Sequence, residues 1–148
     1  MYRHILIPTD GSELAGHAVT SGLSLAKSVG AKVSVIVVEA PFNVFEVPES
    51  KARQLPEEFT KHNEQIKKHA TSVLNRSAAA AKAAGVSCDT IQVEHEHPYQ
   101  AIIAAAKDKG CDLIVMASHG RSGLSALLLG SVTNKVLTHT KTPVLVCH

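Results

Sequence analysis

Glycine and hydroxyl residues are concentrated in one stretch of the sequence, Met116 to Thr133. Gly120 and Gly130 carry no side chain that would keep backbone N–H groups away from a bulky anion. Ser131 and Thr133 add hydroxyl groups where a helix is expected to begin and to present N–H groups without a partner. This combination is typical of phosphate binding. Because glycine and serine are also ordinary turn residues, the residue types alone leave a purely structural loop as the alternative.

The established phosphate-binding fingerprints are absent from the chain. It contains neither G-x-x-x-x-G-K-[ST] nor G-x-G-x-x-G. No nucleophile beside a base and no pair of carboxylates suited to acid–base catalysis can be identified. The sequence therefore favours anion binding over a dedicated catalytic site.

Three other polar residues are candidates for such a site. Asp10 follows a short apolar run, which would place it at the carboxyl end of a strand, but Asp before Gly-Ser is also a common turn residue. Arg121 could pair with a phosphate or be solvated, and His119 could donate a hydrogen bond. His95 and His97 would share one face of an extended segment, yet no third ligand accompanies them, so a metal site is not expected there.

The elements that must position these residues alternate along the chain. Apolar runs of strand length predict strands at residues 4–9, 32–39, 88–94, 112–117 and 143–147. Helical periodicity predicts helices at about residues 13–29, 57–84, 98–109 and 131–140, the first three ended by Gly30, Gly85 and Gly110. Ser12 or Asp10 is expected to cap the first helix. Residues 40–56, with three prolines, are expected to form a loop.

Strands that alternate with helices predict a doubly wound α/β fold with a mostly parallel sheet and helices on both faces. Ligands of such sheets bind outside the carboxyl ends of the strands. In this chain those ends would bring together residues 8–10, 37–39, 94–97 and 117–120.

Composition limits the class of protein. The 148 residues, 45% of them apolar and 19% charged, predict one globular domain spanning 1–148. A 3% aromatic content and a formal net charge of +2 argue against nucleic acid as a partner. No apolar run is long enough to span a membrane. The cysteines are few and widely spaced, which favours a reducing, cytoplasmic location; they are Cys88, Cys111 and Cys147.

Four segments resemble signatures of the universal stress protein family. They are ILIPTDGS at 5–12, SHGRSG at 118–123, LLGSVT at 128–133 and TPVLV at 142–146. The resemblance covers nearly the whole chain. It implies an adenine nucleotide alpha hydrolase-like fold with five strands in the order 3-2-1-4-5. It also implies a cytoplasmic homodimer that binds ATP, or the related AMP or ADP, with Mg²⁺ or Mn²⁺.

Nucleotide-binding members of that family carry Gly, two residues, Gly, nine residues, Gly, then Ser or Thr. In this chain the pattern falls on Ala117, Gly120, Gly130 and Ser131. Ala117 departs from it, which would weaken binding at a positive φ and be tolerable at a negative one. By resemblance Asp10 accepts ribose hydroxyls and backbone near Val37 meets adenine. The nucleotide-binding residues so implied are Pro8, Thr9, Asp10, Val37, Met116, Ala117, Gly120, Arg121, Gly130, Ser131, Val132 and Thr133.

Other functions compete with nucleotide regulation. Ala117 favours a nucleotide-free dimeric interaction protein of the stress response. A receiver-type phosphorylation switch would need an acidic cluster, whereas Asp10 stands alone at its strand end. At most slow ATP hydrolysis is expected, because no residue that positions water can be identified. The last strand, Val144–Cys147, would form a sheet edge through which two copies could pair.

Overall fold

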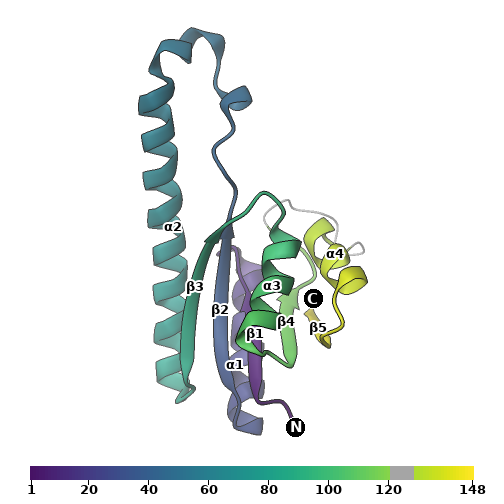
Figure 1. Cartoon of the computed structure of the whole chain (residues 1–148). Helices are drawn as coiled ribbons and strands as arrows, with labels where there is room; N and C mark the ends of the chain where they lie inside the picture. Colours follow the sequence, from purple (N-terminus) through teal and green to yellow (C-terminus); the bar gives the residue numbers. More distant parts are fainter. Residues whose placement is uncertain (121–128) are drawn as a thin grey trace.

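The computed structural model describes residues 1–120 and 129–148, in which strands and helices alternate (Figure 1). The strands are β1 (His4–Pro8), β2 (Lys32–Glu39), β3 (Cys88–Glu94), β4 (Leu113–Ala117) and β5 (Val144–Cys147). The helices are α1 (Glu13–Val29), α2 (Leu55–Ala84), α3 (Pro98–Lys109) and α4 (Ser131–His139). The predicted elements are confirmed with small shifts at their ends. The expected loop contains two short 3₁₀ helices, η1 (Val44–Glu46) and η2 (Glu49–Gln54).

The five strands form one sheet in the order β3-β2-β1-β4-β5, and all neighbouring pairs are parallel. In the register, Ile5 of β1 lies beside Val33 of β2 on one side and Leu113 of β4 on the other. This confirms the predicted doubly wound α/β fold and its strand order. Because β1 is central, its carboxyl end is surrounded by the ends of its neighbours.

Both faces of the sheet are covered, which explains why the central strands are apolar without alternation. Ile5 and Ile7 pack on the face under α1 and α2, whereas Leu6, between them, packs under α3 and α4. The chain thus buries two apolar clusters on opposite faces. These clusters fix the strand ends at which a ligand would bind.

Helix α2 continues well beyond the sheet (Figure 1). Its second half buries Ala70, Val73 and Leu74 in the core, while its first half stands clear of the sheet beside η1 and η2. We call residues 42–66 the arm. Phe42 packs edge-on against Phe59, with ring centroids 5.4 Å apart, and holds the arm together. Within 1–120 and 129–148, no helix is long and apolar enough to cross a membrane.

Candidate functional site

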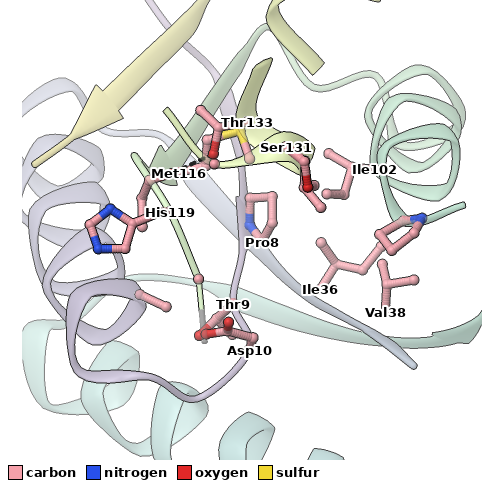
Figure 2. A pocket seen from close by; sticks show the side chains of 16 residues that line it. Pro8, Thr9, Asp10, Ile36, Val38, Ile102, Met116, His119, Ser131 and Thr133 are labelled. Carbon is pink, nitrogen blue, oxygen red and sulfur yellow. Dashed lines mark hydrogen bonds between the residues drawn. The ribbon is translucent and has the colours of Figure 1, made fainter. Parts of the chain in front are cut away.

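A cavity of about 230 Å³ lies at the carboxyl ends of β1 and β4, beside the start of α4 (Figure 2). All the site residues expected from the sequence line it except Val37 and Arg121. Arg121 lies outside the described residues. The structure thus brings residues 8–10 of the sequence to one place with residues 116–120 and 130–133.

Val37 is close to the cavity, but its side chain faces away from it. It is buried in the cluster under α1 and α2, whereas Ile36 and Val38 line the cavity. Successive side chains of a strand point to opposite faces, so this arrangement follows from the strand itself. Only the backbone of Val37 could meet a ligand from this side of the sheet.

The loop after β1 is held by a series of hydrogen bonds. The N–H of Thr9 donates to the carbonyl of Ile36 (2.9 Å), and the N–H of Ser12 donates to Oδ1 of Asp10 (2.9 Å). Oγ of Ser12 accepts from the N–H of Ala15 (3.3 Å), so Ser12 is the N-cap of α1. Asp10 therefore stabilises the turn and lines the cavity at the same time.

Two glycines allow this loop, the end of β4 and the start of α4 to approach one another. A Cβ at Gly120 would overlap Oδ2 of Asp10. A Cβ at Gly130 would lie 2.9 Å from Cα of His119 and 3.3 Å from the carbonyl oxygen of Ser118. The N–H of Gly130 donates to that same carbonyl (2.6 Å). A side chain at Gly130 would therefore force α4 away from the end of β4, whereas a side chain at Gly120 would displace the carboxylate of Asp10.

The start of α4 presents N–H groups at the cavity. Gly130 is its N-cap and provides no side-chain acceptor, so the first N–H groups are available to an anion. Ser131 lines the cavity and is exposed. The hydroxyl of Thr133 is instead buried and donates to the carbonyl of Ala117 (2.8 Å). Thr133 thus ties α4 to β4, and Ser131 is the hydroxyl open to a ligand.

Ala117, the departure from the family pattern, occupies an ordinary strand position. No non-glycine residue in the described part of the chain has a positive φ. Its methyl group therefore causes no backbone strain, and the condition under which alanine would be unfavourable does not arise.

The described residues that line the cavity carry little charge. Asp10 and His119 are the titratable groups among them, and neither lysine nor arginine is present in that set. Nδ1 of His119 lies 3.3 Å from Oγ of Ser118. The positive potential offered to an anion by these residues comes mainly from the N-terminus of α4.

The histidine pair after β3 forms a local turn. Nδ1 of His95 accepts a hydrogen bond from the N–H of His97 (2.8 Å). Over residues 1–120 and 129–148, no group of three or more His, Cys, Asp or Glu side chains could hold a metal ion.

Several residues near the site were not identified from the sequence. Ile36 and Val38 could have been found from the alternation on either side of Val37, and Pro98 and Ile102 are one helical turn apart on α3. His69 of α2 contacts the carbonyl of Asp10 (Nε2 to O, 3.1 Å). No sequence signal marks His69, because its partner is 59 residues away.

Comparisons with known proteins agree with this architecture. The model of the universal stress protein family matches residues 1–148. Universal stress protein YxiE of Bacillus subtilis is 33% identical over 99% of both chains. The solved structure of MJ0577 from Methanocaldococcus jannaschii superimposes with a TM-score of 0.79 and 28% identity, over 99% of this chain and 96% of that one. A universal stress protein solved in complex with cAMP gives a TM-score of 0.71 and 27% identity, over 99% and 97%. This chain belongs to the universal stress protein family.

Proposed function

We propose that the protein binds an adenine nucleotide in the cavity at the carboxyl ends of β1 and β4. The observation that carries this proposal is the close packing of Gly120 and Gly130, which holds the uncapped start of α4 at the cavity. Backbone N–H groups that converge in this way are suited to phosphate oxygens. The related protein solved with cAMP supports an adenine nucleotide as the ligand class.

The rest of the cavity suits the other parts of such a ligand. Ile36, Val38 and Ile102 provide apolar surface on one side, against which a base can pack (Figure 2). The carboxylate of Asp10 can accept hydrogen bonds from ribose hydroxyls. Ser131 and the start of α4 would then meet the phosphates.

The number of charged phosphates on a nucleotide determines whether its binding needs a metal ion. The described lining residues include no lysine or arginine, so a bound cation would add to the neutralisation of the charge on three phosphates. Mg²⁺ is commonly held by one or two carboxylates together with substrate phosphates, and Asp10 is the carboxylate in the described lining. We therefore expect ATP to bind as its Mg²⁺ or Mn²⁺ complex and AMP to bind without metal.

Calorimetry with ATP, ADP and AMP, each with and without Mg²⁺, tests this function. We expect modest affinities. The affinity for ATP should depend on Mg²⁺, whereas the affinity for AMP should not. Mass analysis of ligand released from freshly purified protein would identify the nucleotide held in the cell. If neither experiment detects a nucleotide, the proposal fails and the nucleotide-free interaction protein becomes the better interpretation.

Binding of this kind would serve regulation, with at most slow hydrolysis, because the described lining of the cavity offers no carboxylate besides Asp10. We also propose a cytoplasmic location. The three cysteines are unpaired in the structure, which suits a reducing compartment.

We further propose that the protein is a homodimer formed through β5. This strand lies at the edge of the sheet and pairs with β4, and Leu145 on it is 43% exposed. An apolar edge favours pairing with another chain. Light scattering should show a dimer that Leu145→Lys disrupts. Leu137→Lys on α4 is the matched control, since Leu137 is similarly exposed (38%) away from the edge. A wild-type monomer, or an intact Leu145→Lys dimer, would contradict this interface.

A further inference from the structure

We propose that His69 of α2 positions the carboxylate of Asp10 and thereby sets a preference for ribose over dideoxyribose in the bound nucleotide. This inference rests on the proposed function. His69 does not line the cavity, so it would act through Asp10 and not by contact with the ligand.

The contact between His69 and the loop is direct. Nε2 of His69 lies 3.1 Å from the carbonyl oxygen of Asp10, and because a carbonyl can only accept, the imidazole must carry a proton on Nε2. The next residue, Gly11, has a φ of +82°. A Cβ at Gly11 would lie 3.2 Å from Cε1 of His69 and 2.7 Å from Cγ2 of Val73. Helix α2 therefore packs directly on the backbone of the loop after β1.

This packing holds the backbone of Asp10 through its carbonyl group. The carbonyl of Asp10 accepts from His69, while Oδ1 accepts from the N–H of Ser12 and Oδ2 lies against Gly120. A peptide fixed at its carbonyl restricts the backbone rotation that would swing the side chain. Removing the Nε2 donor should therefore let the carboxylate move relative to the cavity and leave the apolar wall and the start of α4 in place.

A movement of the Asp10 carboxylate should change the affinity for a nucleotide only if that nucleotide has ribose hydroxyls. AMP offers two hydroxyl donors to a well-placed carboxylate, whereas 2′,3′-dideoxy-AMP offers none. A positioning role for His69 thus predicts a selective loss of affinity for AMP. A purely structural role predicts that both nucleotides lose affinity together.

The test measures dissociation constants for AMP and 2′,3′-dideoxy-AMP with the wild type and three variants. We expect the wild type to prefer AMP by about tenfold, as one or two hydrogen bonds to a charged acceptor would give. His69→Leu should reduce that preference to about twofold and leave the affinity for dideoxy-AMP nearly unchanged. His69→Gln should retain the preference, because the Gln amide can donate from a similar position. His62→Leu, on the same helix but in the arm beside Phe42, should behave as the wild type.

The outcomes separate this inference from the proposed function. If the wild type binds neither nucleotide, the proposed function fails. Three results would overturn the role of His69 and leave the binding site in place. The wild type could bind both nucleotides equally, His69→Leu could keep the preference for AMP, or His69→Leu could lose affinity for both nucleotides in parallel. If His69→Leu fails to fold, His69→Asn replaces it, because the shorter amide side chain cannot reach the carbonyl of Asp10. If both His69→Asn and His69→Gln keep the preference for AMP, the role of His69 is also overturned.

Discussion

Polar groups lie at both ends of the parallel sheet, but they have different surroundings. At the amino end, Nε2 of His4 lies 2.7 Å from Oγ of Ser34 and Nδ1 lies 3.1 Å from the carbonyl of Lys109. The carboxylate of Asp112 accepts from the N–H groups of Arg3 (2.9 Å) and His4 (3.1 Å). These groups are partnered within the protein. They hold the strand starts together.

At the carboxyl end, similar groups face a cavity. The start of α4 has no side-chain cap, and the carboxylate of Asp10 and the hydroxyl of Ser131 line the cavity wall. An uncapped helix start, a carboxylate and a hydroxyl that line one cavity are groups suited to the phosphates and ribose of a nucleotide. We therefore expect a structural role for the amino end and, under the proposed function, a binding role for the carboxyl end. Substitutions at the two ends should then change stability and affinity separately.

The largest effect is expected from substitutions of Gly130 at the carboxyl end, of which Gly130→Ala is the milder. The added Cβ would lie 2.9 Å from Cα of His119, so the start of α4 must move away from the end of β4. We expect nucleotide affinity to fall by about 100-fold, equivalent to losing charge-assisted hydrogen bonds from misplaced N–H groups. Gly130→Val should abolish binding. The cause is displacement of α4, since the new side chain would meet the backbone of Ser118 and His119 and not the phosphate space.

Gly16→Ala is the matched control for this substitution. No neighbouring atom lies within 4 Å of a Cβ at Gly16, which is an exposed position inside α1. It should raise the free energy of unfolding by about 0.5–1 kcal/mol and leave nucleotide affinity unchanged. Equal affinities in wild type and folded Gly130→Ala, measured by calorimetry, would contradict the site.

At the amino end, Ser34→Ala should lower stability without changing affinity. Ser34 is fully buried, and the substitution removes the hydroxyl partner of Nε2 of His4. Leaving a buried polar group without a partner costs about 1–3 kcal/mol in the free energy of unfolding. Ser28→Ala on the exposed face of α1 is the control, expected to be nearly neutral. A fall in nucleotide affinity of folded Ser34→Ala would show that the two ends are coupled.

The sequence carried most of the information about the fold because each strand is a short apolar run and each helix has its own periodicity. Gly30 illustrates this, since the predicted helix stop is the C-cap of α1 with a φ of +73°. The segment 40–56 was less predictable: its prolines indicate a break but do not specify the 3₁₀ helices that form there. Local sequence patterns thus determine the helices and strands, whereas tertiary packing determines the detailed structure of the segment 40–56.

The site residues at the carboxyl ends of strands were predictable from the sequence. Contacts that depend on tertiary packing were less predictable. Residue type and position predict Asp10, Gly130 and Thr133, and all three line the cavity, but the sequence does not show that the hydroxyl of Thr133 donates to the carbonyl of Ala117. His69 could not be identified, because a contact across 59 residues depends on how α2 crosses the sheet. A local sequence pattern does not encode such a crossing.

A smaller effect should appear in the dependence of stability on pH. Burial, and next the charge of Lys32, lower the pKa of His4 from its ordinary value of 6.5, so the unfolded chain takes up this proton first. As pH falls below 6.5, the unfolded state is therefore stabilised and the free energy of unfolding decreases. Desolvation opposes the change, but hydrogen bonds from the N–H groups of His4 and Arg3 lower the pKa of Asp112 from its ordinary value of 3.8. Protonation of Asp112 therefore also decreases the free energy of unfolding, but only at a more acidic pH than that of His4.

Urea denaturation at pH 7.5 and 5.5 measures the contribution of His4. The wild type should lose stability between these values, and His4→Gln should lose less. His17→Gln on the exposed face of α1 should follow the wild type, because His17 is not among the buried residues of that helix. A wild type whose stability rises on acidification, or a His4→Gln variant with the same pH dependence as the wild type, would contradict the neutral buried state of His4.

The smallest effect is expected from Ala117→Gly, which restores the glycine of the family pattern. Ala117 belongs to β4 and does not have a positive φ, so glycine relieves no strain there. Its carbonyl accepts from Thr133 whichever residue is present, so the start of α4 keeps its place. We expect nucleotide affinity within about twofold of the wild type, and a loss of about 0.5–1 kcal/mol in stability from the added freedom of the unfolded chain. Calorimetry and urea denaturation measure the two quantities. A large gain in affinity would show instead that the methyl group of Ala117 obstructs the ligand itself, and that the carboxyl end of the sheet has a cavity which this chain partly blocks.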